Sequence, residues 1–438
     1  MQSYKEIRSI DIHYSRKFAL SFIELHGRLD RLLRRFPHTH IYRYTPDPEI
    51  RTTRQSVAFA EIALNNNSTH MGVEGPCALS KLMPDFITGT AIDQMHCVSG
   101  GVVKKLLSLW FDSSNRGKPY SLVDASDIIN NRLISIKPPS FVHRMPRSTE
   151  DLLHWKASEL KNWFFYYVLP VMNGVMQLVY YEHFSLFVAG ISLLNSDSIP
   201  NIDVNVASNI LHKFVSEFEA NDCFRYEDLN GQYLNVINGT RLIDSQIVRS
   251  HNQQLKLQKF VDELPEGKIK DFCSYKTYND DYMIPNNVQL ALENFLPVLK
   301  IQEYLRFLKD GKLYVSERYT GALQTSSSYA LYRDHTGYHL GSIICFVKLS
   351  YCQCINENNC LNHRPPVHQV IIQTLLSERA FNVTYNQNVQ YNIPYLYKSL
   401  KMDNYISIDV NRLISVCFGV KVGDDLYVAI PINSNNNE

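Results

Sequence analysis

The spacing of apolar positions changes near residue 300. Before it, apolar side chains recur every three or four residues, as in the stripe Phe18, Phe22, Leu25, Leu29, Leu32 and Leu33, which is typical of amphipathic helices. The same spacing repeats helix after helix between about 148 and 220. After 300, alternating runs divided by turn residues predict strands at 312–318, 328–333, 339–349, 367–375, 405–409 and 426–430. We therefore expect a helical first part and an antiparallel sheet, rolled or closed as a small barrel, in the last third.

Proline, glycine and polar runs predict the domain boundaries. The stretch around Pro265, Gly267, Asn279 and Pro285 has the composition of a linker. The expected organisation is a basic helical segment at 1–70, a core at 71–260 containing a helical insertion at about 148–220, a linker and helix at 261–300, a β-rich domain at 301–432, and a disordered tail at 433–438.

Composition is that of a globular protein, with 45% hydrophobic and 20% charged residues and a net charge of +1. No global field therefore draws the chain to nucleic acid. Residues 1–54 are locally basic, with eleven Lys and Arg against six Asp and Glu. Arg28, Arg31, Arg34 and Arg35 fall at helical spacing, which is compatible with a solvated helix face or with a phosphate-binding face.

Several patterns bear on the compartment. The first 17 residues lack the apolar run of a secretory signal, and no uninterrupted apolar run is long enough to span a bilayer. Nine cysteines in such a chain are interpreted as thiols or metal ligands. We expect a nuclear or cytosolic protein without a membrane partner.

The first candidate site is the pair Asp93 and His96, three residues apart just before an apolar helix predicted at 101–111. On a tight turn or a first helical turn, a carboxylate and an imidazole at this spacing can converge on one metal ion or one phosphate. The pair alone is a weak signal, because surface pairs of this kind are common. Its surroundings make it informative.

Several motifs occur together in a fixed order. They are Gly72-Val73-Glu74-Gly75-Pro76, Leu79-Ser80-Lys81-Leu82, Asp93-x-Met95-His96-Cys97-Val98, Ser135-Ile136-Lys137-Pro138-Pro139-Ser140, Pro146-Arg147-Ser148, Trp155-Lys156-Ala157-Ser158-Glu159, Tyr226-Glu227-Asp228-Leu229-Asn230-Gly231 and Asn238-Gly239-Thr240. In combination they resemble transposases of the CACTA/Mirage/Chapaev group, from about residue 70 to 250.

The resemblance implies a fold and a chemistry. It predicts an RNase H-like α/β core with an all-helical insertion, in which acidic residues bind two Mg²⁺ or Mn²⁺ ions for phosphodiester transfer. Asp93 matches the family's second catalytic aspartate, and Glu227 with the adjacent Asp228 lies where the third acidic residue is expected. His96 matches the signature histidine, which orients the scissile phosphate or an acidic ligand.

Two departures from the family pattern change the expected function. No credible first carboxylate precedes residue 93, and the chain runs from Phe218 to Tyr226 without the histidine-bearing helix of the family. Two carboxylates cannot arrange two metal ions. We therefore predict a protein derived from a transposase, in which DNA cleavage and strand transfer are lost and DNA binding remains. An active metal-dependent transposase is the alternative within this class.

Residual DNA binding is expected to be non-specific and directed at phosphates. The candidate residues are Arg28, Arg31, Arg34, Arg35, Lys104, Lys105, Arg132, Lys137, Arg144 and Arg147.

The second constellation gathers metal-ligand residue types within twelve positions: Cys352, Cys354, Cys360 and His363. Thiolates and imidazole at short spacings can close a tetrahedral structural Zn²⁺ site, although this spacing fits no established zinc class. Reduced thiols in a loop are the other interpretation. With zinc, a different function becomes possible, a nuclear protein–protein interaction module. The sequence does not determine an oligomeric state.

Overall fold

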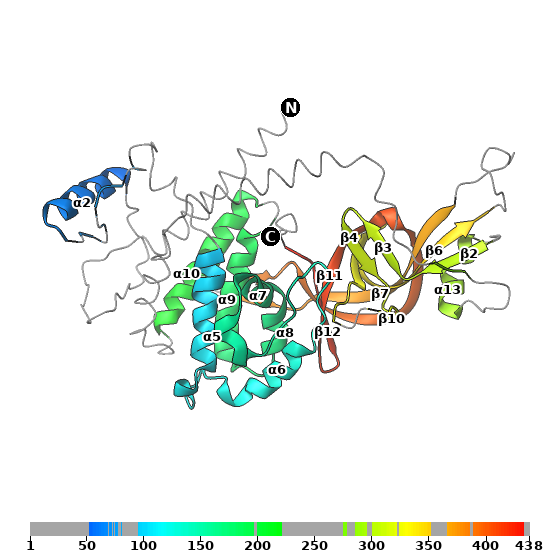
Figure 1. Cartoon of the computed structure of the whole chain (residues 1–438), viewed down its shortest axis with the longest axis horizontal. Coiled ribbons are helices and arrows are strands. Elements are labelled where there is room, and N and C mark those ends of the chain that lie inside the picture. Colours follow the sequence, from blue (N-terminus) through cyan, green and yellow to red (C-terminus); the bar gives the residue numbers. More distant parts are fainter. Residues whose placement is uncertain are drawn as a thin grey trace.

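The protein is described from a computed structural model. It describes residues 52–68, 70, 71, 73, 75–77, 80, 95–196, 199–220, 275–277, 285–295, 300–321, 324–351, 366–385 and 389–432. Helices of the first half lie beside strands of the second half (Figure 1). The structure therefore consists of two architectures in contact, and each follows from the spacing of its apolar residues.

The helical part begins with α2 (Thr53–Asn65), whose N-terminus carries a capping box between Thr52 and Gln55. The remaining helical elements pack together around α9 (Leu178–Leu194), in which residues 183–193 are buried. A helix that is apolar all round belongs in a core. The others are η1 (Met95–Val103), α5 (Lys104–Phe111), η2 (Ser113–Asn115), η3 (Val123–Ala125), α6 (Ser126–Ile134), η4 (Thr149–His154), α7 (Ala157–Asn162), η5 (Trp163–Tyr167), α8 (Val168–Met172) and α10 (Asn201–Ala220).

No helix of the described residues has both the length and the apolar character needed to cross a membrane. This includes α9, whose apolar surface is covered by its protein neighbours, α10 above all.

The strands form a closed antiparallel barrel. Its order is β6-β5-β11-β12-β10-β7, and pairing of β7 with β6 closes the ring. Strand β2 adds to β6 outside the ring, and β1 adds to β2. The ring strands are β5 (Tyr329–Arg333), β6 (Tyr338–Ser350), β7 (Val367–Arg379), β10 (Leu396–Asp409), β11 (Leu413–Val422) and β12 (Asp425–Ala429). The remaining elements are β1 (Tyr275–Thr277), α13 (Asn286–Ala291), η6 (Glu293–Phe295), β2 (Lys300–Tyr304), the hairpin β3 (Arg306–Lys309) and β4 (Lys312–Val315), the hairpin β8 (Asn382–Tyr385) and β9 (Val389–Asn392), and η8 (Val410–Arg412).

Local chemistry explains the bends of the sheet. The β3–β4 turn places Asp310 and Gly311 at φ +50° and +71°, as the two-residue turns of twisted hairpins require. Register shifts interrupt the pairing of β10 with β7, of β11 with β5 and of β6 with β7. Such bulges bend strands and allow a sheet to close.

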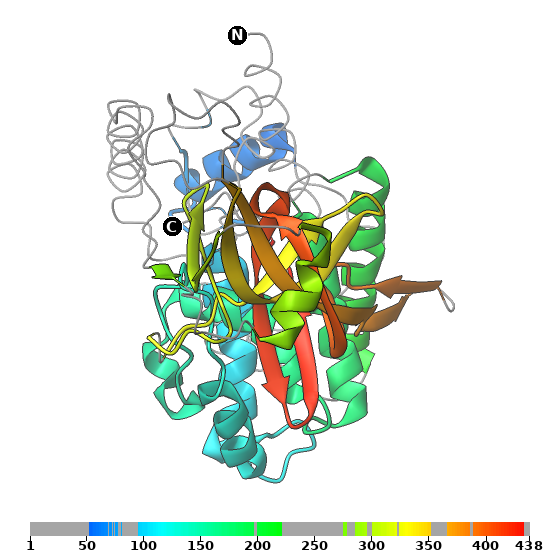
Figure 2. The ribbon, with the colours of Figure 1, turned by 90° about the vertical axis from the view of Figure 1, so that its right-hand side faces the viewer.

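The helices and the barrel share one hydrophobic core. Tyr166 of η5 stacks on Phe418 of β11, with ring centroids 3.9 Å apart. The Tyr395 hydroxyl donates to the carbonyl of Phe165 at 2.8 Å, and the Tyr166 hydroxyl accepts from the backbone N–H of Ile432 at 3.0 Å. Figure 2 shows the red strands β11 and β12 in front of the cyan and green helices. Folding of either part therefore depends on the other.

The predicted fold class is wrong. An RNase H-like α/β core followed by a small β domain requires a mixed sheet before residue 260, but every described element between 95 and 220 is helical. The described strands come after residue 274 and form the antiparallel barrel with its added strands and hairpins. The resemblance of the motifs to a transposase family predicted a sheet in a segment whose apolar residues have helical spacing. The six runs predicted as strands from alternation overlap β4, β5, β6, β7, β10 and β12.

The contact between α9 and α10 gives a first prediction. A Cβ at Gly190 would lie 2.6 Å from Cγ of Leu211, so Gly190→Ala forces the helices apart. We expect a loss of about 1–2 kcal/mol in the free energy of unfolding, because overpacking outweighs the better helix propensity of alanine. Urea denaturation measures this. Gly75→Ala is the control, since nothing lies within 4 Å of that Cβ. Equal stability of the two variants would contradict the packing.

A second prediction concerns His183, which is buried against the Phe214 ring and bonded through Nε2 to the Phe214 carbonyl at 2.7 Å. Burial lowers the pKa of His183 from its ordinary 6.5. As the pH falls below 6.5, the unfolded state takes up a proton that the folded state disfavours, so stability decreases, by at most about 1.4 kcal/mol per pH unit. In His183→Gln this component should disappear from denaturation curves between pH 7 and 5. The same pH dependence in His183→Gln as in the original protein would contradict this role of His183.

Candidate functional site

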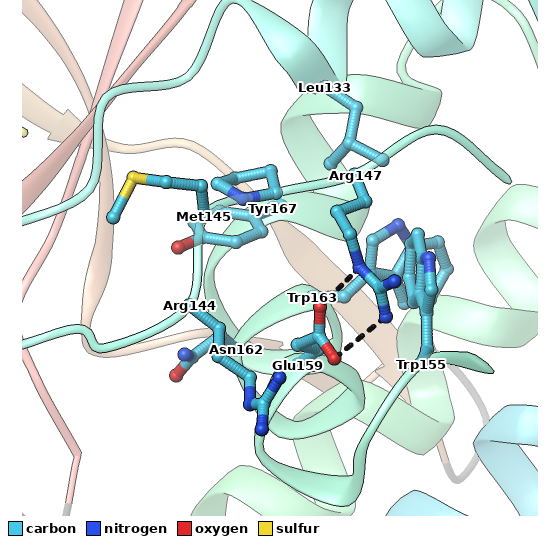
Figure 3. A pocket seen from close by; sticks show the side chains of 10 residues that line it. Leu133, Arg144, Met145, Arg147, Trp155, Glu159, Asn162, Trp163 and Tyr167 are labelled. Atoms are coloured by element: carbon cyan, nitrogen blue, oxygen red, sulfur yellow. Dashed lines mark hydrogen bonds and ion pairs between the residues drawn. The ribbon is translucent and has the colours of Figure 1, made fainter. Parts of the chain in front are cut away.

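A small pocket opens where the loop after α6 returns to the helices. The loop leaves α6 at Ser135, touches the barrel where Ser326 N–H donates to the Pro138 carbonyl, and comes back to η4. The pocket has a volume of about 10 Å³. Its lining residues are Leu133, Arg144, Met145, Pro146, Arg147, Trp155, Glu159, Asn162, Trp163 and Tyr167 (Figure 3).

A two-pronged ion pair forms one wall. Arg147 donates from Nε to Oε1 of Glu159 at 2.7 Å and from Nη2 to Oε2 at 3.0 Å (Figure 3). The backbone N–H of Lys156 adds a bond to Oε2 at 2.8 Å. The hydrogen bond to Glu159 raises the pKa of Arg147 further. Glu159 is only 8% exposed, and both of its carboxylate oxygens are occupied.

Two buried donors in the lining lack partners. The indole Nε1 of Trp163 and the hydroxyl of Tyr167 make no hydrogen bond in the described structure, and the residues are 1% and 3% exposed. Burial raises the pKa of Tyr167 far above 10, so its hydroxyl keeps its proton. Leaving a buried donor unsatisfied costs about 1–3 kcal/mol. Buried donors without a partner are rare in native proteins.

Basic residues occur in the lining and in the neighbouring segments. Arg144 in the lining and Lys137 in the same loop are both exposed. Lys104 directs Nζ to the carbonyl of Leu153 at 3.5 Å, and the next carbonyl, that of His154, accepts from Arg147 at 2.9 Å. Among the ten described lining residues, the acidic group is Glu159 alone, and it is fully bonded. The lining therefore carries two guanidinium groups and one carboxylate.

The other predicted phosphate-binding residues have different positions. Arg132 donates from Nη1 to the carbonyls of Val171 and Asn173 at 2.7 and 2.8 Å, so it closes the C-terminal end of α8. Lys105 is half-buried on α5. Of the six described candidates, Lys137, Arg144 and Arg147 belong to the loop. Lys104 on α5 reaches the carbonyl of Leu153, and Arg132 has a structural role in α8.

Most residues predicted to carry metal chemistry lie outside the described residues. These are Asp93, Glu227, Asp228, Cys352, Cys354, Cys360 and His363. The predicted phosphate-binding residues Arg28, Arg31, Arg34 and Arg35 also lie outside the described residues. His96 belongs to η1, but its side chain is not among those described. Within the described part of the chain, no three His, Cys, Asp or Glu side chains are grouped to hold a metal ion.

The polar lining was not anticipated from the sequence. The apolar spacing of this region favours a core position for Trp163 and Tyr167, which their burial supports, but it gives no sign of their unpartnered polar atoms. A signal was present: Glu159, Trp163 and Tyr167 follow one another at intervals of four, which places them on one helical face. Nothing in the spacing shows that two of the three lack partners.

Comparison with family models, curated proteins and solved structures finds no match to this chain.

The ion pair gives a third prediction. Arg147→Gln leaves the buried Glu159 carboxylate without its counterion and should lower the free energy of unfolding by about 2–3 kcal/mol. The neighbouring Arg144→Gln removes the same charge from an exposed position and should change stability by less than about 0.5 kcal/mol. Urea denaturation of both variants measures the difference. Similar losses would show that the pair does not stabilise the fold.

Proposed function

We propose that this protein binds nucleic acid through its phosphates at the loop 135–148 and the adjoining start of α5. The observation that carries the proposal is the exposed Arg144 at the mouth of a pocket whose single carboxylate is already fully bonded. A guanidinium without a carboxylate partner favours phosphate. Lys137 is an exposed cation of the same loop, and Lys104 at the start of α5 reaches the carbonyl of Leu153.

The structure supports rigid presentation of this surface. The loop is held at one end by the barrel, through the Ser140 N–H bond to the Ser327 hydroxyl at 2.9 Å, and at the other end by Arg147 on Glu159. Phe141 packs edge-on against Phe418 between them. Lys137, His143 and Arg144 then point outward from a backbone that is fixed on both sides. Less conformational freedom is lost when such a surface binds.

The proposal agrees with the resemblance to CACTA/Mirage/Chapaev transposases, because the loop carries the motifs 135–140 and 146–148. Derivation from such a transposase is part of the proposal. The proposal is limited to binding, because the acidic residues that would carry out phosphodiester transfer in such a transposase lie outside the described part of the chain. The nuclear location, the structural zinc and protein partners stay predictions.

The fourth prediction tests binding by its salt dependence. The affinity of the full chain for a short DNA duplex should fall linearly in log–log form as salt rises from about 50 to 200 mM, since counterions are released. The double variant Lys137→Gln with Arg144→Gln should bind more weakly and reduce the slope by about 2, or about 1 for each lost phosphate contact. Fluorescence anisotropy at several salt concentrations measures both.

The matched control removes the same charge from the barrel. Arg412→Gln with Lys421→Gln changes two exposed cations of η8 and β11 and should keep the original slope. Absence of binding at low salt, or an affinity that is independent of salt, would overturn the proposal. If both double variants reduced the slope of affinity against salt equally, DNA binding would not be assigned to the loop.

A further inference from the structure

We infer that a second pocket, on the barrel, receives one unpaired base of a single-stranded nucleic acid beside the exposed ring of Tyr338. The pocket has a volume of about 540 Å³, within the range of roughly 300–1,000 Å³ that is typical of sites for small ligands. The inference rests on the proposed function in one respect, because it takes the partner to be nucleic acid. It adds a contact to a base, whereas the loop contacts phosphates.

Strand register brings most of the lining to one face of four neighbouring strands. Opposite residues of paired strands point to the same face, as do residues two apart along one strand. Leu331 of β5 opposes Leu340 of β6, and Arg333 opposes Tyr338. The face continues through the pairing of β6 with β7 and of β7 with β10. The lining residues on it are Leu331, Tyr338, Leu340, Leu375, Ser377 and Tyr397.

Tyr338 is an exposed aromatic residue in this lining. It is 63% exposed, whereas every other Phe, Tyr and Trp among the described side chains is buried or half-buried. Leu376, which also lines the pocket, is 62% exposed. Large apolar surfaces are unfavourable in water. Proteins that bind single strands stack unpaired bases on such aromatic rings, and every base offers a planar face for this contact.

Two arginines beside the pocket complement the backbone of a strand. The guanidinium of Arg333 lies 5.6 Å from the centroid of the Tyr338 ring, and Arg379 lies opposite Tyr397 in the pairing of β7 with β10. Both arginines are exposed. Cations next to stacking rings are typical of sites for single-stranded nucleic acid. The charges therefore favour a base with its flanking phosphates over an apolar side chain of a protein partner.

The turn between β5 and β6 holds this side of the pocket in position. Oδ1 of Asp334 accepts from the Thr336 hydroxyl at 2.6 Å and from the backbone N–H groups of Thr336 and Gly337 at 2.7 and 3.1 Å. Nε2 of the lining residue His339 lies 3.1 Å from the same oxygen. The bond from the Thr336 hydroxyl and the two backbone bonds lower the pKa of Asp334 far below its ordinary 3.8. This carboxylate is therefore engaged within the turn that leads to Tyr338.

Single-stranded and duplex DNA of equal length test the inference on the full chain. At about 200 mM salt, contacts to phosphates are weakened. There the protein should bind an oligothymidine of about twelve nucleotides about tenfold more tightly than the duplex, because only the single strand offers unpaired bases for stacking. Fluorescence anisotropy measures both affinities. Equal affinity for the two forms overturns the inference.

Variants of Tyr338 assign the preference to the pocket. Tyr338→Ala should abolish it, and Tyr338→Phe, which keeps the ring, should retain it. Tyr319→Ala is the matched control, since Tyr319 also lies beneath an arginine, Arg306 at 5.0 Å, but outside the pocket lining. This control should bind both forms as the original protein does. A preference that persists in Tyr338→Ala, or is lost equally in Tyr319→Ala, overturns the inference.

Cross-linking locates the base directly. A single strand that contains 5-iodouracil forms a covalent bond with a contacting aromatic residue on irradiation, and peptide mass spectrometry should find this bond at Tyr338. Cross-links confined to other residues overturn the inference.

The loop variant separates this inference from the proposed function. Lys137→Gln with Arg144→Gln should weaken binding of both DNA forms and keep the preference for the single strand. Duplex binding without that preference overturns the inference and leaves the proposed function. Single-strand binding that depends on Tyr338 but not on the loop overturns the proposed function alone. Self-association in sedimentation that is lost in Tyr338→Ala, without a preference for single strands, assigns the surface to a second copy of the chain and overturns the inference.

Discussion

The ten consecutive buried residues 163–172 are the constraint on which the rest of the structure depends. They form η5 and α8, and they lie between the helical part and the barrel. Trp163 and Phe164 pack on Phe184 of α9, whereas Tyr166 stacks on Phe418 of the barrel. Neither the helices nor the barrel can bury this segment alone, because each would leave a row of large apolar side chains in water. Helices and barrel are therefore one folding unit.

The same constraint produces the pocket. Because η5 is π-helical, its side chains are distributed differently from those of a regular helix, and aromatic rings reach both the helices and the barrel. The polar ends of two rings are carried into the interior with them. Burial that stabilises the rings thus leaves Trp163 and Tyr167 without acceptors, at the place where the basic loop passes. The ion pair of Arg147 and Glu159, one turn before η5, holds that loop in position.

Part of this arrangement was predictable. The helical periodicity before 220 and the alternation after 300 are local, and the described elements of those regions follow them. The cluster of cations near 132–147 was also visible, although Arg132 proved to bind carbonyls of α8. The inference from the transposase-like motifs to an RNase H-like core was wrong. A short motif reports which side chains are near one another in sequence, and it does not report whether the intervening chain forms a sheet.

The sequence by itself indicated helices before residue 220 and six of the strands after residue 300, because helix and strand periods are set by residues three to four or two positions apart. It also determined the charge of the loop and the apolar character of η5. Only the tertiary structure decided that the strands close into a ring, that the ring and the helices share a core, and that Glu159 is taken up by Arg147 while Trp163 and Tyr167 lack partners. These outcomes depend on contacts between residues up to 266 positions apart, as in the bond between Tyr166 and Ile432. Local spacing carries no information about such contacts.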